Sequence, residues 1–142
     1  MIVVDIGNTN VVIGIYIKSK LTYIYCFETK SEKIISLINK KINNKNIYQY
    51  KIDYKICIVS SVVPEINNII INFFKNIGLE VFNINYLNAP IKIKFKIDNP
   101  EELGNDRIAN SISAVNKYGK DCLILDFGTV TTFDVIKNNA YE

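Results

Sequence analysis

The sequence predicts an α/β fold, because strand-like apolar runs alternate with segments of helical periodicity. The first two apolar runs, residues 1–4 and 11–16, flank a small polar turn, which is typical of a tight β-hairpin. The same plan of strand, turn and strand returns at residues 123–136. An internal repeat at this distance indicates a duplicated domain and not a short solenoid.

The N-terminal hairpin carries a conspicuous set of polar residues. Asp5 ends an otherwise apolar strand, where an ionised carboxylate needs a partner. Gly7 lets the backbone turn and approach a ligand, and Asn8, Thr9 and Asn10 supply donors. Such a turn presents N–H groups and hydroxyls to phosphate oxygens, with the carboxylate facing a metal ion. The pattern predicts a phosphate-and-metal site, and an ordinary hairpin with polar turn residues is the alternative.

The second copy repeats the order of aspartate, apolar residue, glycine and hydroxyl turn. Its aspartate, Asp126, follows Asp5 by 121 positions. Two facing Asp-x-Gly turns, one in each repeat, would clamp the phosphates of a nucleotide between two lobes. We expect a first lobe at residues 1–120 and an incomplete second lobe at residues 121–142, so that this chain is the N-terminal part of a longer protein.

Periodicity and capping signals predict the elements between the two hairpins. A third strand is expected at residues 21–28, and Ser31 is the predicted N-cap of the helix that follows. After a fourth strand at residues 54–60, Ser60, Ser61 and Pro64 signal the start of a helix. The serines are interpreted as capping residues, and contact with substrate or nucleotide is the alternative. The remaining expected elements are a helix over residues 64–76, a strand at 80–84, an extended segment at 92–97 and a helix that Gly119 closes.

Composition excludes several classes of function. A net charge of +3 is too small to argue for nucleic acid, and we expect neither a leader nor a membrane-spanning segment. The cysteines Cys26, Cys57 and Cys122 are odd in number and have no paired spacing, so they are predicted to be buried free thiols in a reducing cytoplasm. Because the chain has no histidine, proton chemistry falls to carboxylates, lysines or tyrosines.

Four motifs in order resemble the signatures of the type III pantothenate kinase family. They are DIGNTN at residues 5–10, SSVVP at 60–64, NPEELGNDR at 99–107 and DFGTVTTFD at 126–134. The resemblance implies a ribonuclease-H-like fold of the actin and sugar-kinase superfamily, with the second repeat truncated after its first hairpin. It also implies ATP-dependent phosphorylation of pantothenate to 4'-phosphopantothenate, the first step of coenzyme A biosynthesis.

The resemblance assigns pantothenate binding to the turn formed by Gly104, Asn105, Asp106 and Arg107. In this assignment Asp106 is the general base, and Arg107 pairs with the pantothenate carboxylate through a charge-assisted fork. Asn105 stands where the family more often has alanine. The structural alternative for Asp106 is an ordinary helix N-cap. Ile97 replaces a tyrosine that helps to hold the substrate in the family, so pantothenate affinity is predicted to be reduced.

The remaining roles implied by the resemblance concern ATP and cations. Thr129 matches a nucleotide contact, and Asp126 matches a ligand of a monovalent cation, K⁺ or NH₄⁺. Magnesium accompanies ATP, and a cytoplasmic homodimer is implied. The alternatives are another kinase of the superfamily and a truncated, inactive nucleotide-binding remnant or regulatory relative of the family. The residues that match the first ATP phosphate loop are Asp5, Ile6, Gly7, Asn8, Thr9, Asn10, Val11 and Val12.

Overall fold

The computed structural model describes residues 1–43, 55–89, 93–128 and 130–142. It divides into two compact units, Met1–Asn83 and Ile84–Glu142. Each unit combines strands and helices, so the predicted α/β class is confirmed. Residues 84–120 group with the second hairpin because they supply a strand and a helix that pack on it. The predicted lobe boundary at residues 120/121 marks the start of the repeat and stays a prediction.

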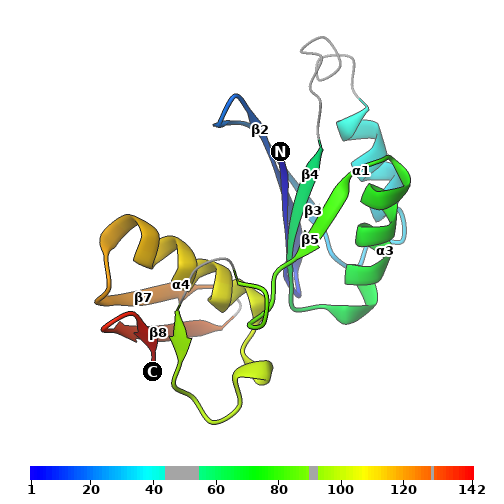
Figure 1. The fold of residues 1–142 in the computed structure, drawn as a ribbon. Coiled ribbons are helices and arrows are strands. Elements are labelled where there is room, and N and C mark those ends of the chain that lie inside the picture. The colour runs from blue at the N-terminus through cyan, green and yellow to red at the C-terminus, as the bar shows by residue number, and fades with distance from the viewer. Residues whose placement is uncertain (44–54, 90–92, 129) are drawn as a thin grey trace. The chain divides into compact units, whose positions relative to one another are not determined.

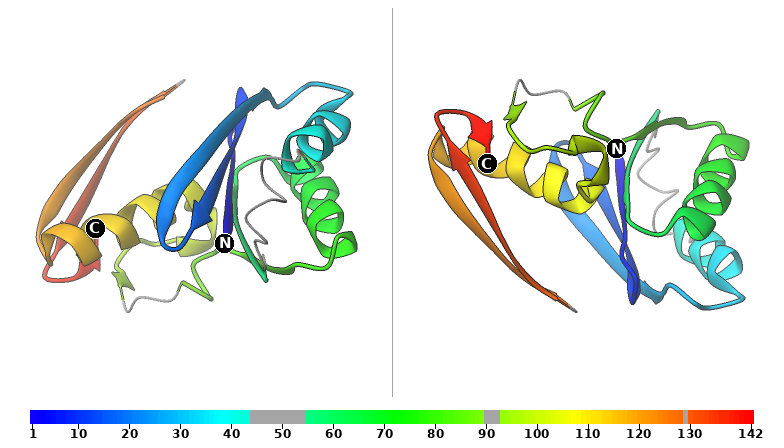
Figure 2. Two further views of the ribbon diagram at one scale, coloured as in Figure 1. Left: turned by 90° about the horizontal axis from the view of Figure 1, so that it is seen from above. Right: turned by 90° about the horizontal axis from the view of Figure 1, so that it is seen from below.

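The first unit is built on a mixed sheet with the strand order β3-β2-β1-β4-β5. The first three strands are antiparallel, and β4 and β5 run parallel to β1. Both helices cover the same face of this sheet, as Figures 1 and 2 show. The elements are β1 (Ile2–Ile6), β2 (Asn10–Ile17), β3 (Lys20–Glu28), α1 (Ile34–Ile42), β4 (Ile56–Ser61), α3 (Pro64–Asn76) and β5 (Glu80–Asn83).

The core of the first unit follows from the two periodicities of its sequence. Alternate residues of β1 point to the helices, while Asp5 points to the other face and is exposed. Helix α1 contributes every fourth residue of an amphipathic pattern. Fully buried members of this core include Ile2, Ile6, Ile13, Ile15, Ile38, Ile70 and Phe74.

The predicted serine caps are wrong for both helices of the first unit. Helix α1 has Lys33 as its N-cap, because Ser31 lies in the preceding turn and accepts the Ile34 N–H with its backbone carbonyl at 3.0 Å. Helix α3 has Val63 as its N-cap and begins at Pro64 as predicted. The Ser61 hydroxyl accepts the Val63 N–H at 3.2 Å from its place at the end of β4.

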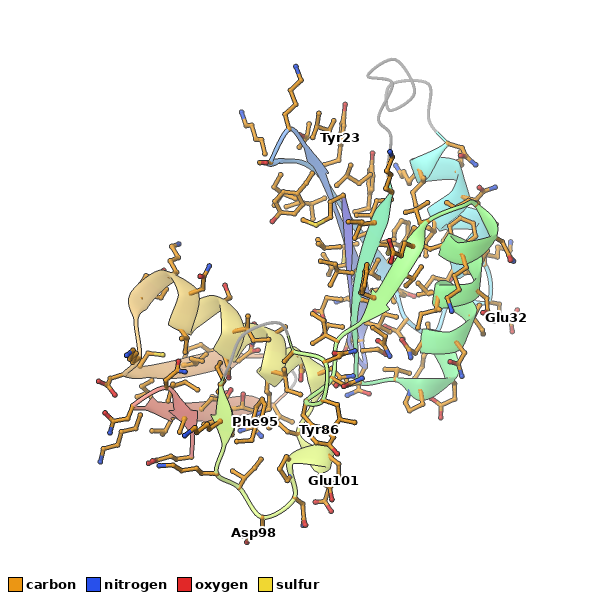
Figure 3. The ribbon with its side chains drawn as sticks, viewed as in Figure 1. Tyr23, Glu32, Tyr86, Phe95, Asp98 and Glu101 are labelled. Atoms are coloured by element: carbon orange, nitrogen blue, oxygen red, sulfur yellow. The ribbon has the colours of Figure 1, made fainter. Side chains whose placement is uncertain are left out.

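The second unit places one long helix against a four-stranded sheet of order β6-β9-β8-β7. Its helix α4 ends at Tyr118, and Gly119 follows with a φ of 106°, a conformation that favours glycine, as predicted. Asp98 and Glu101, which is part of the short helix η1, are exposed in the segment that precedes α4 (Figure 3). The elements are β6 (Lys94–Phe95), η1 (Pro100–Glu102), α4 (Asn105–Tyr118), β7 (Cys122–Phe127), β8 (Thr131–Lys137) and β9 (Ala140–Tyr141).

The hairpin formed by β7 and β8 has one covered face and one exposed face. Ile124 and Ile136 point into the core of the second unit. The opposite side, which we call the apolar face, consists of Leu123, Leu125, Phe127, Phe133 and Val135, each at least 43% exposed. The β7 members of this face are the repeat equivalents of Ile2, Val4 and Ile6, which lie under the helices of the first unit.

The two repeated hairpins differ in the length of their turns. Asp5 pairs with Val12 across the first hairpin, whereas Asp126 pairs with Thr132 across the second. The last pair before the first turn is Ile6 with Val11, and the last pair before the second is Phe127 with Thr131, so the second connection is one residue shorter. The offset between the copies falls from 121 before the turn to 120 after it. Within the described residues, no helix is long and apolar enough to cross a membrane.

Candidate functional site

The first Asp-x-Gly turn is closed by backbone hydrogen bonds. The Gly7 N–H donates to the Asn10 carbonyl at 2.9 Å, and a Cβ at Gly7 would lie 3.3 Å from the same oxygen. Asp5 and the three polar residues of the turn are exposed. The turn therefore presents amide and hydroxyl groups to solvent, as a phosphate-binding loop requires.

Thr29 stabilises this turn through two hydrogen bonds, and the sequence analysis did not identify this residue. It follows β3, and its hydroxyl donates to the Gly7 carbonyl at 2.7 Å. Its N–H donates to the Thr9 carbonyl at 3.0 Å, and the residue is 1% exposed. The one sequence signal for Thr29 is its position directly after the third strand. Because this strand pairs with the second, its end lies beside the first turn. Thr29 thus fixes two of the carbonyls that shape the turn.

Asp106 and Arg107 lie in the first turn of α4. The N-cap of this helix is Gly104, so the interpretation of Asp106 as the N-cap is wrong: Asp106 already lies inside the helix, one residue after its start at Asn105. Its Oδ1 accepts the Arg107 N–H at 2.7 Å, which satisfies one of the free donors of the first turn. Within the described chain its Oδ2 has no hydrogen bond, and the side chain is partly exposed.

The Arg107 guanidinium is held by a buried carboxylate. Its Nε donates to Oδ1 of Asp134 at 2.7 Å, and its Nη2 donates to the same oxygen and to the Phe133 carbonyl. The hydrogen bond that Arg107 donates to Asp134 raises the pKa of Arg107, so the side chain stays charged. The Tyr141 hydroxyl also donates to Asp134 Oδ1, and burial together with this contact raises the pKa of Tyr141.

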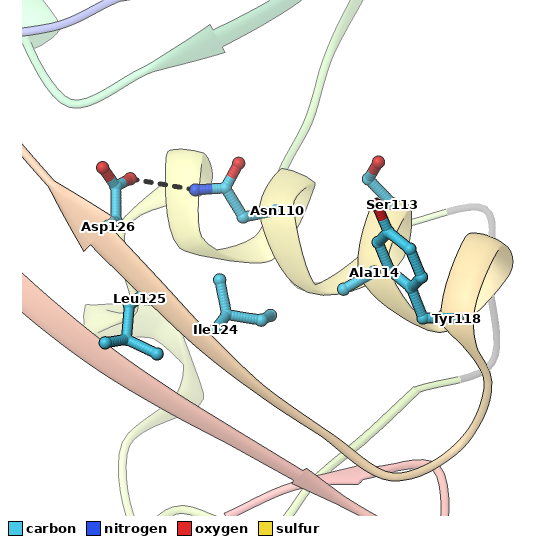
Figure 4. Close-up of a pocket in the computed structure, with 7 residues that line it drawn as sticks. All are labelled: Asn110, Ser113, Ala114, Tyr118, Ile124, Leu125 and Asp126. Atoms are coloured by element: carbon cyan, nitrogen blue, oxygen red, sulfur yellow. Dashed lines mark hydrogen bonds between the residues drawn. The ribbon is translucent and has the colours of Figure 1, made fainter.

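Asp126 lies at the end of β7 beside a hollow of about 360 Å³. Its Oδ2 accepts a hydrogen bond at 3.0 Å from Nδ2 of Asn110, a residue of α4 (Figure 4). The hollow is lined by Asn110, Ser113, Ala114, Tyr118, Ile124, Leu125 and Asp126. Asp126 Oδ1 has no hydrogen bond to any other described residue.

The second unit by itself contains part of the predicted site. In the second unit, α4 carries Asn105, Asp106 and Arg107 directly after Gly104. Thr129 lies outside the described residues. Ile97 packs against the core cluster that contains Tyr141, so it serves as a packing residue here. No group of three or more His, Cys, Asp or Glu side chains suited to a metal occurs in the part of the chain that the structure describes.

The cysteines correct one further prediction. Cys57 is fully buried in the first core, as expected, and burial raises the pKa of its thiol to about 12. Cys26 is exposed instead, because β3 is the edge strand of the sheet and this residue points away from the core. The thiol at Cys122 is partly buried.

These features define a class of α/β protein. Its marks are a duplicated Asp-x-Gly hairpin and an Asp-Arg pair in the first turn of a helix. The sequence model of the family described as type III pantothenate kinase matches residues 1–142. The chain therefore belongs to the type III pantothenate kinase family.

Individual relatives give the same result. The chain is 35% identical to a type III pantothenate kinase of Roseiflexus sp. (strain RS-1), over 96% of this chain and 54% of that protein. It is 35% identical to one of Kosmotoga olearia, over 99% and 54% of the two chains, and 34% identical to one of Listeria welshimeri, over 100% and 56%. The chain spans about half the length of the curated relatives that it matches.

Proposed function

We propose that this protein acts as a pantothenate kinase, which transfers a phosphoryl group from ATP to pantothenate and forms 4'-phosphopantothenate for coenzyme A biosynthesis. The observation that carries the proposal is the Asp106–Arg107 pair at the start of α4, in a chain that matches the family from residue 1 to 142. Among the described residues, one carboxylate oxygen of Asp106 has no hydrogen-bond partner, and Arg107 keeps its charge.

Asp106 and Arg107 have complementary tasks in this proposal. The Asp106 oxygen that has no partner among the described residues accepts the proton of the pantothenate hydroxyl. At the same time the hydroxyl oxygen attacks the γ-phosphorus of ATP, and ADP leaves. The Arg107 side chain is 34% exposed, and its guanidinium attracts the carboxylate of the same substrate. Together they orient an anionic hydroxy acid, and orientation supplies much of the rate in phosphoryl transfer.

The first turn has the chemistry to bind the phosphates of ATP. Its exposed polar residues and the close backbone at Gly7 suit the approach of phosphate oxygens. The residues proposed to take part are Asp5, Ile6, Gly7, Asn8, Thr9, Asn10, Val11 and Val12, together with Thr129. Magnesium on ATP would neutralise charge on the transferred group.

Asp126 fits the proposed role of a ligand for K⁺ or NH₄⁺. One of its carboxylate oxygens, at the edge of an open hollow, has no partner among the described residues, and the other is oriented by Asn110. Oxygen ligands suit a hard cation. Asp126 would hold such an ion near the phosphates and lower the electrostatic repulsion between them.

Three finer assignments complete the proposal. The sheet order of the first unit, with three antiparallel strands followed by parallel strands, supports a ribonuclease-H-like fold of the actin and sugar-kinase superfamily. A homodimer is proposed from membership of the family alone. A biosynthetic kinase that uses ATP and pantothenate is proposed to work in the cytoplasm.

The test is a direct assay of ADP release and phosphopantothenate formation by the complete product of the gene. The reaction is run with pantothenate and ATP–Mg²⁺, in K⁺ and then in Na⁺ buffer. We expect turnover that depends on pantothenate and is higher in K⁺. A catalytically silent protein that binds ATP but releases no phosphopantothenate would favour the inactive relative of the family.

A further inference from the structure

Arg107 is the only arginine among the 17 basic residues of this chain. Elsewhere the sequence uses lysine wherever it needs a positive charge. Arginine differs from lysine by a planar group with five donors in a fixed arrangement, so a site that needs oriented donors cannot use lysine. The surroundings of this one guanidinium therefore show what orients it.

The guanidinium has one occupied edge and one open end. Nε and Nη2 donate to Asp134 Oδ1, and Nη2 also reaches the Phe133 carbonyl at 3.4 Å. Nη1 has no hydrogen-bond partner in the described part of the chain. Asp134 thus occupies the side-on edge, so the predicted fork between Arg107 and the substrate carboxylate cannot use that edge, and Nη1 is the group left for an anion.

Asp134 is itself fixed by its surroundings. Its side chain is 0% exposed, and Tyr141 donates its hydroxyl to the same Oδ1. The Tyr141 ring also lies 5.9 Å from Arg107 Cζ and 6.0 Å from the ring of Phe95, which Figure 3 marks on β6. Arg107 from α4 and Tyr141 from β9 therefore both donate to one carboxylate oxygen on β8, and Phe95 of β6 packs against the Tyr141 ring.

The hairpin plan does not require this carboxylate. Asp134 pairs with Ile124, and the equivalent pair of the first hairpin is Gly14 with Val3. The first copy therefore folds with no side chain at this position. Replacing a buried ion pair by apolar residues is often neutral or stabilising, so stability alone gives no reason for Asp134.

We propose that Asp134 and Tyr141 are positioning residues that hold the Arg107 guanidinium so that its Nη1 end faces the carboxylate of the substrate. This assignment rests on the proposed function for the identity of the substrate. The orientation of Arg107 itself is independent of that identity.

The first test observes Arg107 directly and uses no substrate. In a ¹⁵N-labelled 142-residue chain a single arginine gives a single Nε–H signal, so the signal needs no assignment. We expect its exchange with water to be at least about tenfold slower than in the urea-unfolded chain, and faster in Asp134→Asn and in Tyr141→Phe. Exchange in the folded wild type as fast as in urea would overturn the positioning role.

The second test measures kinetics in the variants. Asp134→Asn is expected to raise the KM for pantothenate about 10- to 100-fold, with the KM for ATP changed less than about threefold. Tyr141→Phe is a second, independent variant, which keeps the ring and decides the question if Asp134→Asn does not fold. It should raise the KM for pantothenate by a smaller factor. Glu142→Gln, which removes a carboxylate from an exposed ion pair with Lys96, is the matched control and should change neither constant.

The combination with Arg107→Lys separates positioning from general damage. If Asp134 acts through Arg107, adding Asp134→Asn to Arg107→Lys raises the KM for pantothenate little further. Effects that multiply, or an equal rise in the KM for ATP, would overturn the proposal. A wild-type protein without pantothenate-dependent turnover would refute the proposed function, and the exchange measurement would still decide the role of Asp134.

Discussion

The hydrogen bond from Thr29 to Gly7 allows us to measure how much one residue contributes to the stability of the first turn. Thr29→Val preserves the volume and shape of the side chain and removes only the hydroxyl that donates to the Gly7 carbonyl at 2.7 Å. Losing such a bond costs about 0.5–1.5 kcal/mol net, and a carbonyl left without a donor raises the cost to about 1–3 kcal/mol. Because Gly7 is only half-buried and water reaches its surroundings, we expect a loss of about 1–2 kcal/mol.

Urea unfolding followed by circular dichroism measures this loss, which corresponds to a decrease in midpoint of about 0.5–1 M. Thr29→Ser is the matched control, because it keeps the hydroxyl and removes one methyl group, at a cost of about 1 kcal/mol. Since the two variants lose similar stability, ATP binding separates them. Thr29→Val should weaken ATP binding and Thr29→Ser should not. Equal ATP affinity in both variants would refute the reasoning that Thr29 shapes the turn.

Three further substitutions test other parts of the molecule. Asp106→Asn keeps an oxygen for the helix N–H, so urea stability should stay nearly constant while turnover falls on the order of 10²–10⁴-fold; near-normal turnover would place the general base elsewhere. Because the pKa of the Cys57 thiol is raised in the folded protein, the thiol ionises at lower pH in the unfolded chain than in the folded one. The free energy of unfolding should therefore decrease between pH 9 and 12, by up to roughly 4 kcal/mol, and the decrease should be less steep in Cys57→Ala. A thiol reagent at neutral pH should label exposed Cys26 quickly and Cys57 only on unfolding; fast labelling of both would contradict the buried position. Gly14→Ala would place a Cβ 2.8 Å from Val3 Cγ2, and we expect a loss of about 1–3 kcal/mol in urea unfolding, which an unchanged midpoint would exclude.

The parts of the fold that were predicted from sequence are those with local signals. The first hairpin, the start of α3 at Pro64 and the end of α4 before Gly119 each depend on residues within a few positions. The capping serines failed because Ser31 and Ser61 form hydrogen-bonded turns just outside the helices, and sequence does not show at which residue helical geometry begins.

The supporting contacts of the candidate site were not visible in the sequence. Thr29 is 22 residues from Gly7, and Asp134 is 27 residues from Arg107. Such pairs become neighbours only when strands take their register, and the shorter second turn shifts that register by one residue relative to the repeat. The motifs identified Asp106 and Arg107 as chemically active, whereas their partners depend on tertiary structure.

Strand β7 combines two properties that seldom occur together in a soluble protein. It lies at the edge of its sheet, so one row of its backbone groups has no neighbouring strand within the described structure. It also carries Leu123, Leu125 and Phe127 on the apolar face. An edge strand of this kind is a template for strand addition and aggregation. We therefore expect Leu125→Lys, which places a charge on this edge strand, to raise the concentration at which this chain stays monodisperse.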